Sequence, residues 1–203
     1  MLIARADRVV IDLGTGDGRA VIARARQDPA ALVIGIDASA AAMAESSLRA
    51  ARPARKGGLP NALFVVAAAE RPPGELIRIA TEVTITMPWG SLLRGALALP
   101  DSEDAAAGIA GLVAPGGRVR SLLSIDPRDR LALPALDATD GPVLAERWRG
   151  YGLRLASFGP ADPAILAASG SSWARRLGAG RGRTVWQLDL DRPVPEGDVA
   201  ARR

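Results

Sequence analysis

Short runs of β-branched and other apolar residues alternate along this chain with longer stretches rich in Ala, Leu and Arg. Such alternation is typical of a parallel α/β sheet whose strands are connected by helices. The predicted strands cover residues 9–13, 32–37, 63–66, 83–87, 118–125, 153–158 and 185–190. The predicted helices cover residues 18–28, 39–51, 73–80 and 102–113. Ser39 is the expected N-cap of the second helix, because its hydroxyl can accept a hydrogen bond from a free backbone N–H.

The length of 203 residues favours one domain, which we place at residues 1–191. A Pro115-Gly116-Gly117 turn precedes the fifth strand, and residues 126–150 read as a loop with a short helix. Residues 192–203 are rich in Pro and charge and are expected to form a frayed tail. No run resembles an export signal or a membrane span, so we expect a cytoplasmic protein.

The chain contains no Cys and no His. This excludes disulfides, Cys/His zinc sites, thiol nucleophiles and imidazole bases, and we expect no metal. The net charge is +4, and Lys56 is the only lysine, so nearly every cation is an arginine. Arginine binds phosphates through two parallel hydrogen bonds, but a composition rich in Ala and Arg explains the bias equally well, so the position of each arginine must decide.

The segment from Asp12 to Arg19, DLGTGDGR, follows the first strand. Glycines at such a turn permit positive φ and a close approach of a ligand to the backbone, although the turn alone could hold a dinucleotide or no ligand. Asp12 would face a pyrophosphate unfavourably but suits a ligand with a cationic amino acid end. Asp37 ends the second strand, where a carboxylate can accept both hydroxyls of a ribose. With the Pro-Gly-Gly turn, these features favour S-adenosylmethionine (SAM) over a nicotinamide cofactor.

Two further segments follow strands. Ala67-Ala68-Ala69-Glu70 lies after the third strand, where small residues leave room for an adenine ring and Glu70 can accept a hydrogen bond. Pro88-Trp89-Gly90 lies after the fourth strand, where an aromatic side chain without an amide suits stacking on a base whose ring nitrogen carries a lone pair.

Aromatic residues make up only 3% of the chain, yet Trp173 lies close to four arginines in a Gly-rich segment. A stacking platform beside cations is typical of single-base recognition, although core packing with a solvated basic face is the structural alternative. Trp148 and Trp186 are expected to be structural, one in a helix and one in the last strand.

The sequence resembles the kanamycin-apramycin resistance methyltransferases, which modify N1 of adenine 1408 in 16S ribosomal RNA. The resemblance extends from Val10 to Trp186, and its most specific segments are Pro88-Trp89-Gly90 and Ser171-Ser172-Trp173-Ala174-Arg175-Arg176-Leu177. It implies a Rossmann-like class I methyltransferase with a seven-stranded, mostly parallel sheet, an antiparallel last strand and helices on both faces. It also implies SAM as cofactor, S-adenosyl-L-homocysteine as product, and 16S rRNA in the assembled small subunit as partner of a monomeric protein.

The resemblance assigns roles to matching residues. The implied SAM-binding residues are Asp12, Gly14, Thr15, Gly16, Gly18, Asp37, Ala69, Glu70 and Met87. Trp89 and Trp173 would sandwich a flipped adenine beside Pro88, and Ser171 would help to place the Trp173 loop. The implied RNA-binding residues are Arg52, Arg55, Lys56, Arg175, Arg176, Arg181 and Arg183. The segments expected to contact RNA are residues 52–60, 126–150 and 160–183.

Relatives usually begin with an N-terminal hairpin, whereas only eleven residues precede Asp12 here, so we expect a missing lid and weaker docking. Adenine N1 carries a free lone pair, so the absence of His does not prevent this reaction. The alternatives are a SAM-dependent methyltransferase acting on another RNA or a small molecule, and a non-catalytic module that binds SAM or RNA.

Overall fold

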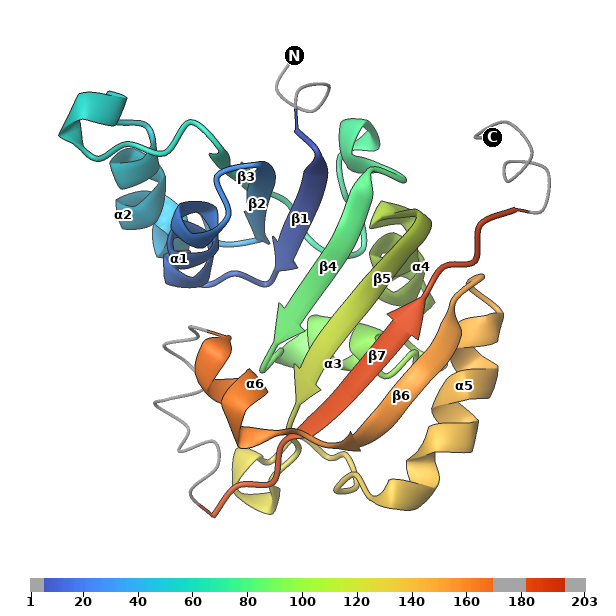
Figure 1. Cartoon of the computed structure of the whole chain (residues 1–203). Helices are drawn as coiled ribbons and strands as arrows, with labels where there is room; N and C mark the ends of the chain where they lie inside the picture. Colours follow the sequence, from blue (N-terminus) through green and yellow to red (C-terminus); the bar gives the residue numbers. More distant parts are fainter. Residues whose placement is uncertain (1–5, 170–181, 196–203) are drawn as a thin grey trace.

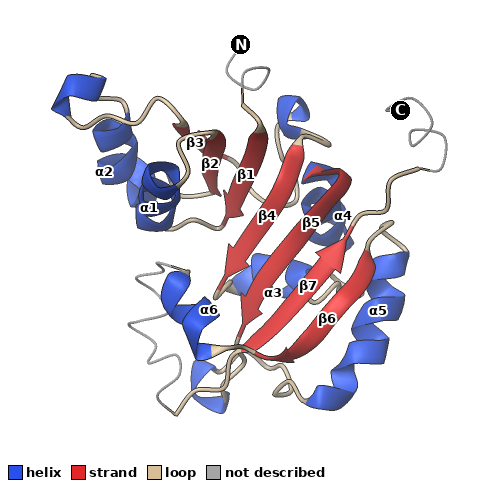
Figure 2. Ribbon diagram, in the orientation of Figure 1, coloured by secondary structure: helices blue, strands red, loops and turns tan. Residues whose placement is uncertain are grey.

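The computed structural model of the chain describes residues 6–169 and 182–195, which form one seven-stranded sheet with helices on both faces (Figure 1). The strands are β1 (Arg8–Leu13), β2 (Ala31–Asp37), β3 (Ala62–Val66), β4 (Ala80–Thr86), β5 (Val113–Leu123), β6 (Arg154–Pro160) and β7 (Trp186–Asp191). Their order across the sheet is β3-β2-β1-β4-β5-β7-β6. Only β7 runs antiparallel to its neighbours β5 and β6 (Figure 2), as the family resemblance implied.

The helices divide between the two faces of the sheet. They are α1 (Arg19–Gln27), α2 (Ala40–Ala50), α3 (Gly90–Ala96), α4 (Glu103–Leu112), α5 (Gly141–Arg149) and α6 (Pro163–Ala168). Figure 1 shows α3, α4 and α5 behind the sheet, with α1, α2 and α6 in front. Apolar residues of β1 alternate between the two layers. Ile11 and Leu13 belong to the large cluster that includes α4, while Val10 packs with Val21 and Ile22 of α1.

Two predicted elements were wrong. The helix expected at 73–80 is only a 3-10 turn, Gly74–Leu76, because Pro72 and Pro73 restrict the backbone before it and strand β4 already begins at Ala80. The Pro-Gly-Gly segment does not precede β5 but lies within it, where the register with β4 shifts and Gly116 has φ of 77°.

Helices α3 and α6 were not predicted, because both are short. In α6, Asp162 caps the first turn by accepting a hydrogen bond of 2.7 Å from the Ala164 N–H, and Pro163 occupies a favourable first position. Helix α3 begins at Gly90, whose φ is 57°.

Arg192, the first residue of the predicted tail, is hydrogen-bonded to the rest of the fold. Arg192 exchanges two backbone hydrogen bonds with the Gly116-Gly117 bulge of β5. Its guanidinium donates to the carbonyl oxygens of Ala110 at 2.7 Å and Tyr151 at 3.4 Å, close to the C-terminal ends of α4 and α5. Helix C-termini favour cations, so Arg192 fastens β7 to two helices.

Within residues 6–169 and 182–195, no helix is both long enough and apolar enough to cross a bilayer.

Candidate active site

The glycine turn between β1 and α1 is bound to the end of β2. The backbone N–H groups of Gly14 and Thr15 donate to the Ile36 carbonyl at 2.8 and 3.1 Å. Gly14 and Gly16 have φ of 74° and 57°, which side-chain-bearing residues rarely adopt. The turn therefore presents a bare backbone surface at the carboxyl end of the sheet, where open α/β sheets bind ligands.

Gly18 has a different role from the one expected. It does not line the cavity described below, and a Cβ there would lie 2.5 Å from the Phe64 ring and 2.9 Å from Ser46 Cβ. Its φ of 70° starts α1 against α2 and β3. Gly18 is thus needed for close packing rather than for direct contact with a cofactor.

Asp37 is held by backbone donors on both of its oxygens. The Gly16 N–H donates to Oδ2 and the Ser39 N–H donates to Oδ1, each at 2.8 Å. A carboxylate has about four acceptor positions, so both oxygens can still accept further hydrogen bonds. The arrangement fits a pair of vicinal hydroxyls.

Asp12 is a buried carboxylate with no ion pair to any residue in the described ranges. Its Oδ1 accepts a hydrogen bond of 2.9 Å from the Thr84 hydroxyl on the neighbouring strand. Burial raises the pKa of the Asp12 carboxyl above its ordinary value, the Thr15 and Thr84 side chains oppose this rise, and the charges of Asp37 and Asp17 add to it. A cationic ligand group beside Asp12 would relieve this cost.

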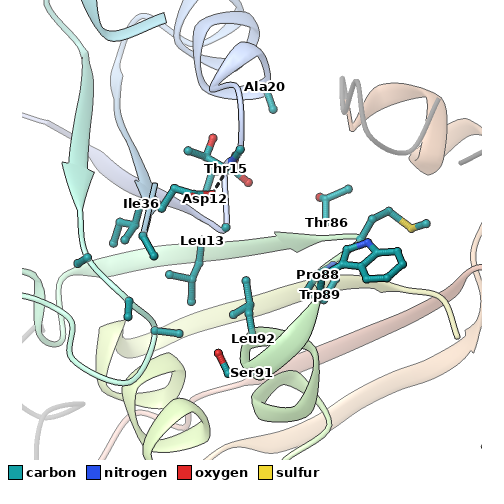
Figure 3. A pocket seen from close by; sticks show the side chains of 18 of the residues that line it. Asp12, Leu13, Thr15, Ala20, Ile36, Thr86, Pro88, Trp89, Ser91 and Leu92 are labelled. Atoms are coloured by element: carbon teal, nitrogen blue, oxygen red, sulfur yellow. Dashed lines mark hydrogen bonds between the residues drawn. The ribbon is translucent and has the colours of Figure 1, made fainter. Parts of the chain in front are cut away.

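One cavity of about 490 Å³ brings most of the predicted site residues together. The predicted residues that line it are Asp12, Gly14, Thr15, Gly16, Asp37, Ala69, Glu70, Met87, Pro88 and Trp89. Figure 3 shows Asp12 and Thr15 on one side of the cavity and Pro88 and Trp89 on the other. The volume falls within the range of roughly 300 to 1,000 Å³ that is usual for small-molecule sites.

The side of the cavity formed by Met87, Pro88 and Trp89 is built on an unusual backbone. Met87 has φ of 53°, and its N–H donates to the Leu122 carbonyl at 2.8 Å, which fixes the end of β4 against β5. The chain then turns through buried Pro88 into Trp89, which is 38% exposed at the start of α3. The strained backbone therefore presents an aromatic face at the mouth of the cavity.

Sequence reasoning missed several lining residues, among them Thr86, Ser91 and Leu92. Leu92 rises from α3 toward Leu13 (Figure 3), and its Cδ2 occupies the space that a Cβ on Gly14 would need. The pairing of β1 with β4 was foreseeable from the fold class and could have indicated Thr86, but α3 was not predicted, which hid Ser91 and Leu92.

The predicted RNA-binding residues differ in where they lie. Arg52, Arg55 and Lys56 are all exposed on the loop after α2, which contains the 3-10 turn Ala54–Lys56. The predicted site residues Ser171, Trp173, Arg175, Arg176 and Arg181 lie outside the described residues. Trp148 and Trp186 are buried as expected, with Trp186 stacked on Phe158 at 5.0 Å between ring centroids.

Arg183 is not the exposed cation that the sequence suggested. Its guanidinium forms two hydrogen bonds of 2.6 Å with the two carboxylate oxygens of Asp129, and both side chains are 6% exposed. Asp129 in turn accepts a hydrogen bond from the Asp126 N–H at 3.2 Å within the 3-10 turn Pro127–Asp129. In this structure Arg183 fastens the loop after β5 to the segment before β7, because a paired and buried guanidinium is not displayed to solvent.

Together, the strand order, the glycine turn, and acidic residues at the ends of β1 and β2 around one cavity define a class I methyltransferase. The family model "NpmA: 16S rRNA (adenine(1408)-N(1))-methyltransferase" matches residues 1–191, and the chain belongs to this family.

Relatives and solved structures agree with this assignment. The 16S rRNA (adenine(1408)-N(1))-methyltransferase of Streptoalloteichus tenebrarius is 36% identical over 189 residues, which cover 90% of this chain and 86% of the relative. That of Escherichia coli is 31% identical over 197 residues, with 92% and 88% covered. A tryptophan-to-alanine variant of the Catenulisporales acidiphilia enzyme, solved with its cosubstrate SAM, superposes with a TM-score of 0.85 at 32% identity and covers 96% of this chain and 90% of that chain. The 16S rRNA methyltransferase KamB gives 0.82 at 35% identity, with 95% and 91% covered.

Proposed function

We propose that this protein transfers the methyl group of SAM to N1 of adenine 1408 in 16S rRNA of the small ribosomal subunit, and that the modification confers resistance to kanamycin and apramycin. It acts as a cytoplasmic monomer on the assembled subunit. The observation that carries the proposal is one cavity with the unpaired carboxylate of Asp12 on one side and the exposed ring of Trp89 on the other. The family membership of the chain supports the choice of nucleotide.

The residues of the cavity fit SAM, which supplies a methyl group activated on a sulfonium. Asp12 holds the α-ammonium group, because a buried carboxylate without a cation gains most from one. Asp37 accepts the ribose hydroxyls, and the turn from Gly14 through Thr15 to Gly16 lets the backbone approach closely.

The other end of the cavity receives the adenine ring of SAM. Ala69 leaves space for the flat ring, and half-buried Glu70 accepts a hydrogen bond from its amino group. Met87 closes the cavity beside the reacting centre.

The methyl acceptor is a base that has been flipped out of the RNA helix. Trp89 supplies one stacking face beside Pro88, and Trp173 supplies the second, with Ser171 placing its loop. Stacking contributes on the order of 1 to 3 kcal/mol per base, which offsets the few kcal/mol of unstacking. No residue must remove a proton, because N1 carries a free lone pair at neutral pH. Catalysis therefore rests on positioning, which contributes roughly 7 to 11 kcal/mol for well-oriented reactants.

RNA docking uses cations of the loop after α2 and of the segment 160–183. Arg52, Arg55 and Lys56 are exposed and bind phosphates, together with Arg175, Arg176 and Arg181. Because one flipped base cannot define a unique site in a ribosome, specificity comes from the shape of the folded RNA surface. The segments 52–60, 126–150 and 160–183 make these contacts, and the Asp129–Arg183 pair joins the last two.

The test is incorporation of radiolabelled methyl from SAM into purified unmethylated small subunits, followed by reverse transcription across the decoding site. We expect incorporation and a stop at adenine 1408, since an N1 methyl blocks base pairing. Binding of SAM without incorporation would contradict the proposal and favour a non-catalytic module. Incorporation without a stop at this position would indicate a different acceptor.

A further inference from the structure

A second cavity of about 230 Å³ lies on the front face of the sheet, between α1 and α6, and we call it the α1–α6 groove. Figure 1 shows the front of β4 and β5 between these two helices. The residues that give the groove its chemistry are Arg24, Glu82, Thr84, Arg120, Ile165 and Gln187. It shares Asp12, Ala20 and Thr86 with the cofactor cavity, so the two cavities adjoin along the front of β4.

The strand register explains why this part of the sheet is polar. Asp12 pairs with Thr84, Thr84 with Arg120, and Arg120 with Asp189, so these four residues follow one another across β1, β4, β5 and β7. Residues directly opposite each other on neighbouring strands point to the same face. A polar row therefore runs from the cofactor cavity across the floor of the groove.

Two arginines line the groove, Arg24 and Arg120, and of these Arg120 is available for a ligand. Arg24 lies 3.5 Å from Glu82, so these two charges compensate each other. Arg120 is exposed, and within residues 6–169 and 182–195 no hydrogen bond or ion pair to its side chain is present. The neighbouring Asp189 accepts hydrogen bonds through Oδ2 from Ser157 at 3.0 Å and Gln187 at 2.6 Å.

Apolar side chains line the groove together with Arg120. Leu122 lies two residues further along β5 on the same face, and Ile165 of α6 is 43% exposed. We propose that the α1–α6 groove is a second binding site for a phosphate ester, with the phosphate on Arg120 and an apolar or aromatic group on Leu122 and Ile165. Guanidinium binds phosphate oxygens through two parallel hydrogen bonds. The ester comes either from a free organophosphate or from the backbone of an RNA strand that enters the neighbouring cavity.

The probe is phenyl phosphate, titrated into protein saturated with S-adenosyl-L-homocysteine so that the cofactor cavity is filled. We expect Arg120→Gln to weaken binding about tenfold, the size expected for one charge-assisted contact. The matched control is Arg118→Gln, because Arg118 is exposed on the same strand and face but does not line the groove. Benzyl alcohol, which keeps the ring and lacks the phosphate, should bind equally to all three proteins.

Equal affinity of wild type and Arg120→Gln for phenyl phosphate would overturn the proposal. So would binding of the probe to the ligand-free protein that is lost once S-adenosyl-L-homocysteine is bound, since the probe would then occupy the cofactor cavity. The KM for small subunits distinguishes the two sources of the phosphate ester. A higher KM with a weaker salt dependence in Arg120→Gln identifies an RNA phosphate. An unchanged KM identifies a free organophosphate. Phenyl phosphate binding needs no methyl transfer, so this test stands even if the proposed activity fails.

Discussion

Two buried aspartates in this molecule have opposite surroundings. Asp129 is bound through both oxygens by Arg183, whose guanidinium lowers the pKa of the Asp129 carboxyl. Asp12, in the wall of the cofactor cavity, accepts a hydrogen bond from the Thr84 hydroxyl, has no counterion among the described residues, and has a raised pKa caused mainly by burial. The comparison teaches that the Asp129 carboxylate has its counterion within the described fold, whereas the Asp12 carboxylate has none there, which is why we propose that it binds a cationic group of the ligand.

The largest expected effect concerns the paired aspartate. Asp129→Asn should lower the free energy of unfolding by about 3 kcal/mol, because it leaves a buried guanidinium without its counterion. Chemical denaturation of the ligand-free protein measures this. The matched control is Asp126→Asn, whose partner Arg128 is 73% exposed on its side chain and should contribute little. A loss no larger than that of the control would show that the pair does not fasten the loop.

For the unpaired aspartate we expect the opposite pattern. Asp12→Asn should weaken SAM binding about a hundredfold, since removing one member of a buried charge pair costs roughly 2 to 5 kcal/mol. The same change should leave the ligand-free fold as stable as wild type or more stable. Isothermal titration calorimetry and denaturation of one preparation report both values. Unchanged SAM affinity would contradict the proposal that Asp12 binds the ammonium group of SAM.

Removing the Trp89 ring should lower methyl transfer to the RNA without lowering the affinity for SAM. Trp89→Ala should lower kcat/KM on small subunits by roughly tenfold to a hundredfold, from the loss of one stacking face. SAM affinity should change by less than about twofold, because Asp12 and Asp37 remain. Trp89→Phe, which keeps an aromatic face, serves as the matched variant and should recover part of the activity. Wild-type turnover in Trp89→Ala would exclude stacking on this ring.

The smallest effect is the pH dependence of the two aspartates, which should have opposite signs. The pKa of Asp129 is lowered, so its contribution to stability is present above the ordinary value of 3.8 and is lost as the pH falls through the lowered pKa. The pKa of Asp12 is raised, so its contribution is present below 3.8 and is lost as the pH rises through the raised pKa. Denaturation curves of wild type, Asp129→Asn and Asp12→Asn across this range measure both. Parallel curves for the two variants would contradict the comparison.

The sequence was sufficient to place the donor half of the site. Asp12 and Asp37 end neighbouring parallel strands, and parallel strands bring their carboxyl ends to one edge, so local pattern and fold class together locate both side chains. The seven-stranded, mostly parallel sheet with an antiparallel last strand was implied by the family resemblance, and the structure confirmed it.

Other features depend on contacts that no local pattern contains. Arg183 resembled a surface cation because its partner Asp129 lies 54 residues away in the chain. Gly18 resembled a cofactor-binding glycine, but the Phe64 ring and Ser46 decide its role. The short α3 was hidden because its seven residues, from Gly90 to Ala96, give no clear helical periodicity and begin in a strained turn. Long-range packing therefore explains these differences.

The most direct test of the account is mass spectrometry of the decoding-site fragment from small subunits incubated with SAM and either wild-type protein or Asp12→Asn at limiting SAM. The account predicts one added methyl group on adenine 1408 with wild type and little with the variant. An unmodified adenine 1408 in the wild-type reaction, or equal methylation by both proteins, would contradict it.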